Sequence, residues 1–262
     1  GWLQGIARRY VVPHGILHYL PFGALPRPQG KGARFLVEEY EVTYLPAAAA
    51  LVYGAGAENP DGTLLALAPA LARLPYAQEE ARSLSQFFPA RSSVLVGRQA
   101  TESSFKRAAG GYRVIHLATH GYFNKLNPLF SGVQLEPDQA EDGRLEVHEI
   151  LGMRLRANLV TLSACETALG SGYFAEVPAG DDFVGLTRAF LFAGSLSVLA
   201  SLWEVNDRST LSLMRSFYRH LHLGRAPKAT ALAQAQRAML RTGSRYRHPY
   251  FWAPFVLVGA MQ

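Results

Sequence analysis

The feature that most constrains this chain is an alternation, in its second half, of short apolar runs with helices or long connections. Three runs have this character, at residues 113–120 (RVIHLATH), 158–165 (NLVTLSAC) and 195–203 (SLSVLASLW). Short strands that are apolar on both faces are typical of parallel sheets covered by helices on each side. The alternation therefore predicts an α/β sandwich with a mostly parallel central sheet. In such sheets the reactive groups lie at the carboxyl ends of the strands.

Further elements follow from apolar periodicity and from turn and cap signals. Residues 76–88 carry alanine, leucine and phenylalanine at helical spacing, and Thr101 has the type and position of an N-cap. A Pro-His-Gly sequence at 13–15, between two apolar runs, predicts a β-hairpin. Residues 171–182 are the expected mobile loop. The remaining expected elements are strands at 63–69, 93–97 and 254–261 and helices at 183–193, 208–223 and 227–240.

Length and composition favour a well-packed protein. The 262 residues suit one large α/β domain or two small ones, and 49% are hydrophobic against 18% charged. The formal net charge is +6, but lysine and arginine are scattered, so direct nucleic-acid binding is not expected. A single cysteine excludes an intramolecular disulfide, and nothing resembles a signal peptide, so the cytosol is the expected compartment. The apolar stretch 189–203 is shorter than the roughly 20 residues that cross a bilayer, so no membrane partner is expected.

Two histidines, His116 and His120, lie four residues apart. On a helix they would share a face, as zinc ligands do in some metalloproteases, but the β-branched residues beside them favour a strand. On a strand they are roughly 13 Å apart, too far to bind one metal ion, so we expect no metal. We interpret His116 as a core histidine bonded to backbone. His120 is expected to be the last strand residue, projecting from the carboxyl edge of the sheet beside Gly121.

Cys165 ends a run of the same length and composition. Free cysteine is among the most buried residue types, so a structural role is the alternative to a catalytic one. Neighbouring strands lie about 4.8 Å apart, so strands ending in His120 and in Cys165 would bring a base and a thiol to one bound peptide group. No G-x-S-x-G, P-loop or G-x-G-x-x-G sequence offers a competing chemistry, and Ser163 lacks a nucleophile elbow.

The motifs HLATHG and LVTLSACETALG, in this order, resemble the paired signature of CHAT domains, caspase-like peptidases of the caspase–separase–gingipain clan. Further segments extend the resemblance over nearly the whole chain: VVPHGILHYLPFGAL, RLPYAQEEARSL, GLTRAFLFAGSLSVLASLWEVNDRST, MRSFYRHL and HPYFWAPFVLVG. The resemblance implies a caspase-like α/β/α sandwich in which His120 is the catalytic histidine, Cys165 the nucleophile and His116 structural. It divides the chain into a strand-rich N-terminal part at 1–110, for which a degenerate caspase-like half is one interpretation, and a catalytic half at 111–262.

The implied activity is peptide hydrolysis through a thioester acyl-enzyme, with no metal or organic cofactor. The backbone N–H groups of Gly121 and Cys165 are the expected oxyanion donors. In the related separases, the acidic residue of the W-x-V-x-D segment faces a basic side chain before the cut, and Asp207 aligns with it. Glu204 and Asp182 are further candidates for the substrate pocket. The alternative for Asp207 is the N-cap of the following helix.

The resemblance also bears on partners, because CHAT domains often follow tetratricopeptide-repeat (TPR) or other sensor segments. The chain begins at Gly1 rather than at methionine, so we expect a domain of a longer polypeptide. We expect a regulated endopeptidase whose partners are a protein or peptide substrate and an N-terminal or separate sensor segment. The alternative is a catalytically silent CHAT module that serves as a protein-interaction scaffold.

Overall fold

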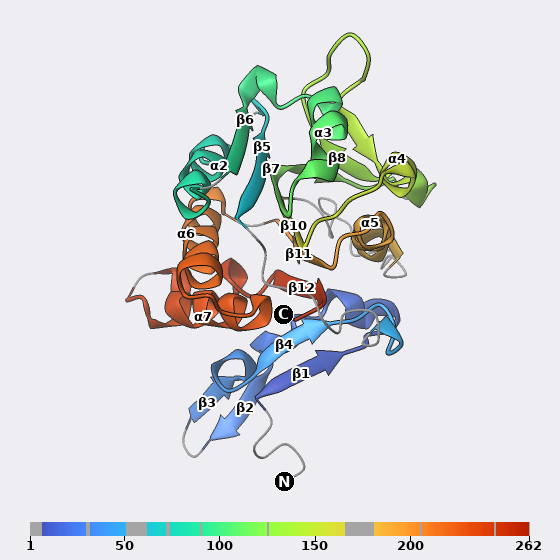
Figure 1. Cartoon of the computed structure of the whole chain (residues 1–262). Helices are drawn as coiled ribbons and strands as arrows, with labels where there is room; N and C mark the ends of the chain where they lie inside the picture. The colour runs from blue at the N-terminus through green and yellow to red at the C-terminus, as the bar shows by residue number, and fades with distance from the viewer. Residues whose placement is uncertain are drawn as a thin grey trace.

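A ten-stranded sheet forms the centre of the molecule (Figure 1). The structure is a computed structural model, and it describes residues 7–29, 32–50, 62–71, 74–89, 91–124, 126–165, 181–204, 206–243 and 245–261. The main path of the sheet runs through β1 (Arg8–Val11), β4 (Glu41–Tyr44), β12 (Phe255–Gly259), β11 (Ser197–Ser201), β10 (Leu159–Cys165), β7 (Val114–Tyr122), β5 (Thr63–Ala68) and β6 (Arg91–Val96). Every pairing along this path is parallel except that of β11 with β12. The predicted mostly parallel sheet is therefore confirmed.

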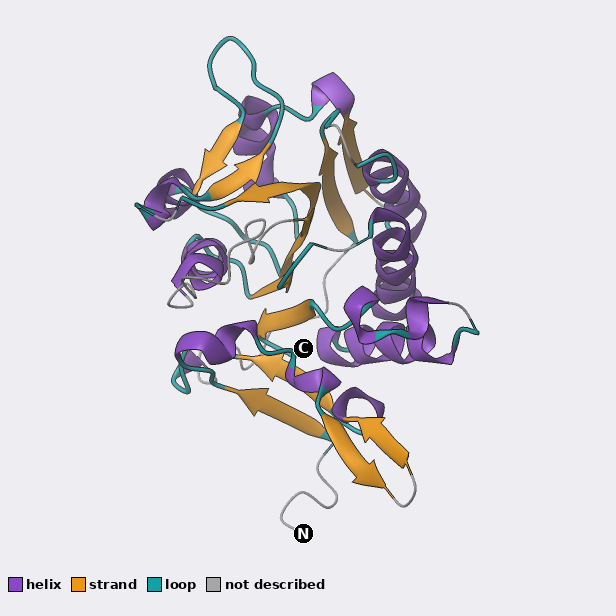
Figure 2. Ribbon diagram, turned by 180° about the vertical axis from the view of Figure 1, so that it is seen from behind, coloured by secondary structure: helices purple, strands orange, loops and turns teal. Residues whose placement is uncertain are grey.

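Helices cover both faces of the sheet (Figures 1 and 2). One layer holds α2 (Ala77–Leu84), α6 (Asp207–Tyr218) and α7 (Lys228–Arg241), and the other holds α3 (Glu102–Ala108), α4 (Val147–Gly152) and α5 (Asp181–Phe192). Because side chains alternate along a strand, β7 feeds both cores. Val114 and Ala118 pack in the core under the first layer, whereas Ile115 and Leu117 pack in the core under the second. These two cores explain why the strands are apolar on both faces.

Most of the predicted elements are confirmed where the described residues test them. The runs expected to be strands at 63–69, 93–97 and 254–261 correspond to β5, β6 and β12, and those expected to be helices at 183–193, 208–223 and 227–240 overlap α5, α6 and α7 with ends shifted by a few residues. Thr101 is the N-cap of α3, accepting a hydrogen bond from the Ser104 amide at 3.1 Å. The expected mobile loop at 171–182 falls outside the described residues up to residue 180.

The hairpin predicted around residues 13–15 is wrong. β1 ends at Val11, and the chain then enters a 3-10 helix at Gly15–Tyr19 instead of a second strand. β1 pairs in parallel with β4, so its partner comes from about thirty residues further along the chain. Turn chemistry indicated a local reversal here, but tertiary pairing with a distant strand decides the structure.

The N-terminal part of the chain contributes strands to both edges of the sheet. β1 and β4 lie beside β12 at one edge, and β5 and β6 lie beside β7 at the other (Figure 1). The predicted boundary between residues 110 and 111 falls in the connection that leads into β7. Strands from both predicted parts thus belong to one sheet, and the division itself stays a prediction.

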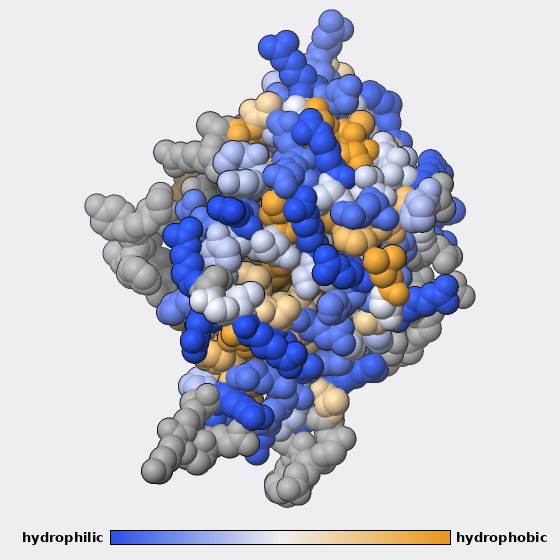
Figure 3. Space-filling model, turned by 90° about the vertical axis from the view of Figure 1, so that its left-hand side faces the viewer, coloured by the Kyte–Doolittle hydropathy of each residue, from blue (hydrophilic) through white to orange (hydrophobic). Residues whose placement is uncertain are grey.

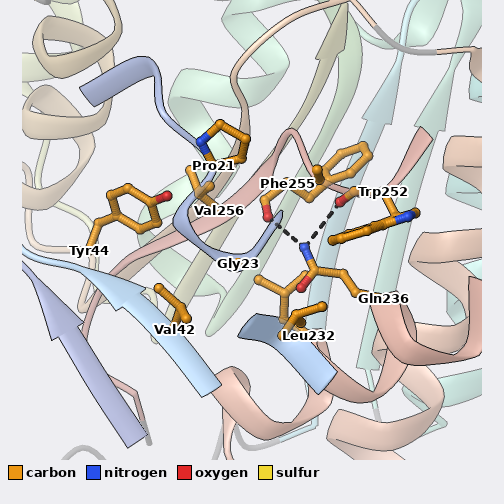
Figure 4. Close-up of a pocket in the computed structure, with 11 residues that line it drawn as sticks. Pro21, Gly23, Val42, Tyr44, Leu232, Gln236, Trp252, Phe255 and Val256 are labelled. Carbon is orange, nitrogen blue, oxygen red and sulfur yellow. Dashed lines mark hydrogen bonds between the residues drawn. The ribbon is translucent and has the colours of Figure 1, made fainter. Parts of the chain in front are cut away.

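Gln236 ties α7 to the segment that leads into β12 (Figure 4). Its Nε2 donates hydrogen bonds to the carbonyl oxygens of Trp252 and Phe255, at 3.1 and 2.9 Å. Beside it lies a cavity of about 20 Å³, lined also by Tyr44 and Gly23. This volume is enough for one water molecule. At this point α7 is therefore closely packed against the sheet.

The outer surface over α2, α6 and α7 is mostly polar, with small separate apolar areas (Figure 3). Within the described part of the chain, none of the helices combines the length and the apolar composition that a bilayer crossing requires.

Candidate active site

His120 and Cys165 lie opposite each other in the sheet. β7 and β10 are adjacent and parallel, and their register pairs His120 with Cys165. Neighbouring strands are about 4.8 Å apart, so the two backbones are close enough for both residues to meet one ligand. Cys165 is also the last residue of β10, which places this pair at the carboxyl end of the strand, as expected. The side chain of Cys165 lies outside the described residues.

The strand that carries His120 is longer than predicted. β7 continues through Gly121 to Tyr122, because beyond His120 it gains a new antiparallel neighbour, β8 (Gly132–Gln134). The Thr119 hydroxyl strengthens this pairing by donating a hydrogen bond to the carbonyl of Gln134. His120 is therefore not the last residue of its strand. It stands where β7 leaves the edge of β10 and begins to pair with β8.

His116 is fully buried but does not bond to backbone as predicted. Its Nε2 lies 2.8 Å from Oε1 of Glu80 on α2, and its Nδ1 lies 3.2 Å from the Tyr218 hydroxyl on α6. The same hydroxyl lies 2.8 Å from Oγ1 of Thr161 on β10. Side chains rather than backbone satisfy His116 because the strand ladder already uses the backbone groups around it. Burial strongly raises the pKa of Tyr218, which keeps its hydroxyl protonated.

This buried network holds together the two strands that carry the candidate pair. His116 and Thr161 are themselves opposite each other in the register, and each lies four residues before His120 and Cys165 respectively. Tyr218 bridges them from the helix layer. The register that brings His120 opposite Cys165 is therefore supported by polar side chains four residues earlier on the two strands and by Tyr218 from the helix layer.

Asp207 is the first residue of α6 and is close enough to His120 for their charges to interact. Its Oδ2 accepts a hydrogen bond from the Tyr76 amide at 2.6 Å. Burial raises the pKa of Asp207, and the charge of Glu80 adds to this, while the Tyr76 hydrogen bond and the interaction with His120 lower it. The N-cap of α6 is Asn206, which accepts from the Ser209 amide at 3.2 Å. The alternative that Asp207 is the cap is therefore wrong by one residue.

Glu204 and Asp182, the other two expected pocket residues, lie on two different segments. Glu204 is exposed on the segment between β11 and α6. Asp182 belongs to α5, but its side chain lies outside the described residues. Among the described side chains of this set, that of Asp207 interacts electrostatically with His120.

Glu80 was not predicted as part of the site, although its position on an apolar helix face indicated a buried carboxylate. Glu80 lies three residues after Ala77 and four before Leu84, so it shares the apolar face of α2. A carboxylate on a buried helix face requires a partner, and only the tertiary structure identifies His116 as that partner. Tyr218 shares the buried face of α6 with Leu211 and Met214, so its hydroxyl carried a similar signal.

One carboxylate cluster away from this site has the spacing of a cation site. Within the described residues, Glu102, Glu141 and Glu149 bring carboxylate oxygens close together. The Lys106 ammonium lies among them, at 2.7, 2.9 and 2.7 Å from Glu102, Glu141 and Glu149 respectively. The lysine thus supplies the positive charge that the carboxylates require, and the cluster ties α3 to α4.

Comparison with known proteins identifies the family of this chain. The family model described as "CHAT domain" matches residues 3–260. Tetratricopeptide repeat protein 28 of Mus musculus is 29% identical over 221 residues, which are 71% of this chain and 9% of that protein. The Homo sapiens protein of the same name is 28% identical over 220 residues, 71% of this chain and 8% of that protein. The chain thus spans less than a tenth of the length of these curated relatives.

Solved structures show the same fold at low sequence identity. The Saccharomyces cerevisiae separase–securin complex contains a chain that matches with a TM-score of 0.63 at 14% identity, covering 96% of this chain and 15% of that one. The Arg-specific cysteine proteinase gingipain R matches with a TM-score of 0.56 at 10% identity, covering 85% of this chain and 55% of that one. Both likenesses concern the architecture of the sheet and its helices.

Proposed function

Because this chain belongs to the CHAT domain family, we propose that it is a cysteine endopeptidase with His120 and Cys165 as its catalytic dyad. The observation that carries the proposal is the register of β7 and β10, which pairs these two residues at the end of β10. A thiol and an imidazole held on adjacent parallel strands are the groups that acyl transfer requires. The caspase-like fold shared with gingipain R and separase supports the same reading.

In the proposed reaction, the Cys165 thiolate attacks the carbonyl carbon of the scissile peptide bond. A C–S bond forms, the C–N bond breaks, and His120 delivers a proton to the leaving amine. Water then hydrolyses the thioester, and the thiol is regenerated. The backbone N–H groups of Gly121 and Cys165 are the proposed oxyanion donors, each contributing roughly 3 kcal/mol by analogy with other acyl-transfer sites. The chemistry needs no metal or organic cofactor.

We assign the recognition of a basic side chain before the cut to Asp207. Its carboxylate is half-buried and fixed by the Tyr76 amide, and a held carboxylate pairs well with a guanidinium. Its proximity to His120 supports this role, because the residue before the cut must lie near the reacting carbonyl. Glu204 and Asp182 are assigned a weaker, long-range contribution to the acidity of the pocket.

We further propose that the chain acts as the regulated effector of a larger assembly with a TPR-containing partner or segment. The observation behind this is that the curated relatives are tetratricopeptide repeat proteins many times longer than the matched region.

The test of the proposed activity is cleavage of an unfolded protein substrate by the wild type and by Cys165→Ala. We expect the wild type to produce fragments whose new carboxyl ends are arginine or lysine, and the variant to produce none. Equal melting temperatures of the two proteins exclude unfolding as the cause. Equal cleavage by both proteins would contradict the dyad and favour a scaffold function.

A further inference from the structure

A hollow of about 240 Å³ lies between α7 and the N-terminal segment that contains β3 (Gly32–Phe35) and the 3-10 helix Leu36–Glu38. Its lining consists of Arg34, Glu38, Arg237, Leu240 and Arg241. Three of these five side chains are therefore guanidinium groups. None of them belongs to the candidate active site.

The two arginines of α7 that line the hollow carry like charges that act on each other. Arg237 and Arg241 are four residues apart on one helix face, a spacing at which like charges repel. Nε of Arg237 donates a hydrogen bond to the carbonyl of Val37 at 2.6 Å, which fixes the guanidinium at the edge of the hollow. Burial lowers the pKa of Arg237 and the charge of Arg241 lowers it further, whereas the charges of Glu41 and Glu38 raise it. An anion in the hollow would offset the repulsion between the two arginines.

The carboxylates nearby compensate these charges only in part, since Glu41 and Glu38 act on Arg237 through their charges without forming an ion pair with it. Oε1 of Glu38 is engaged by the Phe35 amide at 2.9 Å. Arg34 lies opposite Arg27 in the β2–β3 ladder, and Arg27 already pairs with Glu39 at 2.5 Å. Within the described residues, no carboxylate forms an ion pair with Arg34 or with the two arginines of α7.

We propose that this hollow is a binding site for a phosphate group, held by Arg34, Arg237 and Arg241. Three guanidinium groups against one carboxylate leave two positive charges, which match the roughly −2 charge of a phosphate group at neutral pH. A carboxylate ligand would bring one charge and leave the other uncompensated. The planar fork of arginine also suits phosphate oxygens, which it binds through two parallel N–H···O bonds.

The hollow fits a phosphate group better than a nucleic acid strand. Its lining contains no aromatic side chain, whereas single-strand binding relies on stacking of bases on aromatic rings. Because Arg34 comes from β3 and the other two arginines from α7, a bound phosphate ties the N-terminal strands to the helix layer. A ligand that binds the folded protein but not the unfolded chain raises the stability of the fold by mass action.

The experiment is thermal unfolding of the full chain with and without millimolar pyrophosphate, at matched ionic strength. We expect the melting temperature to rise by about 2–4 °C, the shift that about 1 kcal/mol gives in a protein near this size. The double variant Arg34→Gln/Arg241→Gln should lose this rise. Both arginines are exposed, so the variant should fold. The control is Arg98→Gln, which removes an exposed arginine elsewhere and should keep the full rise.

Two further ligands identify what carries the phosphate group and test whether nucleic acid is the partner instead. A phosphoserine peptide measured beside pyrophosphate shows whether the group comes from a modified side chain or from a small molecule. A rise of equal size in the double variant would overturn the proposal, because it would reflect general charge screening. Absence of any rise in the wild type with both phosphate ligands would overturn it too. Binding of an oligonucleotide alone would assign the arginines to nucleic acid instead.

Discussion

Nε2 of His116 lies 2.8 Å from Oε1 of Glu80, and both side chains are closed off from solvent. Removing one member of such a pair leaves the other buried without its partner, which is costly. We expect Glu80→Ala to lower the free energy of unfolding by about 2–4 kcal/mol. The matched control is the neighbouring Glu79→Ala, which breaks an exposed ion pair with Arg215. That change should cost less than about 1 kcal/mol. Urea unfolding of both variants checks this, and equal losses would contradict it.

Two glycines give opposite predictions for the same substitution. Gly143 has φ +85°, and an added Cβ would lie 2.7 Å from the Leu135 carbonyl oxygen. We expect Gly143→Ala to destabilise the protein by about 2 kcal/mol or more. Gly23, beside the small cavity, has room for a Cβ at 3.5 Å from Val37. Gly23→Ala should therefore stabilise by about 0.4–1 kcal/mol. Melting temperatures that shift in the same direction for both would refute this account of the two positions.

Lys228 gives the protein a predicted dependence of stability on pH. It is fully buried, its Nζ donates to the Asn158 carbonyl at 3.0 Å, and burial lowers its pKa to about 7. An unfolded lysine titrates near 10.4, so between about pH 7 and pH 10 the unfolded chain binds a proton that the folded chain does not. The free energy of unfolding should therefore rise with pH across this window and be flat below it.

The variant Lys228→Met isolates this contribution, because it keeps the length of the side chain without the charge. The stability of the wild type relative to the variant should increase from pH 7 to pH 9, by roughly 1 kcal/mol per pH unit. Urea unfolding at several pH values measures the difference directly. A difference that does not change with pH would show that Lys228 has the same charge in both states.

Substrate preference is the predicted function of Asp207. Asp207→Asn keeps an acceptor for the Tyr76 amide but removes the charge, so the protein should fold and lose most of its preference for arginine before the cut. We expect the ratio of kcat/KM for arginine and neutral substrates to fall by about 10- to 100-fold. Glu204→Gln serves as the control, because Glu204 is exposed and should change the ratio by less than about 3-fold. Peptide-library profiling of the two variants distinguishes these outcomes.

The central strands of the sheet could be predicted from the sequence, because each of them is a local run of apolar residues. The apolar runs of β5, β7 and β10 need no partner to be recognised, since both of their faces are buried. β1 could not be placed in the same way. Its residues alternate only weakly in burial, and its partner β4 is known only from the folded topology.

The same distinction holds for the candidate site: residues with a local sequence signal were predicted, and features that depend on tertiary contacts were not. His120 and Cys165 were predicted because each stands near the end of an apolar run, and parallel strands bring such ends together. The extension of β7 to Tyr122 depends on β8, a strand of three residues that carries no clear periodicity. The Glu80–His116 pair joins a helix to a strand across 36 positions of sequence, so only tertiary structure could reveal it.

Covalent labelling by a peptide chloromethyl ketone with arginine at its reactive end tests the central claim most directly. The thiolate displaces chloride to form a thioether, and because the chain has one cysteine, the adduct mass lost in Cys165→Ala reports labelling of Cys165. The account predicts one adduct in the wild type, none in Cys165→Ala, and labelling at least about 100-fold slower in His120→Ala. Labelling of His120→Ala at the wild-type rate would contradict the His120–Cys165 dyad.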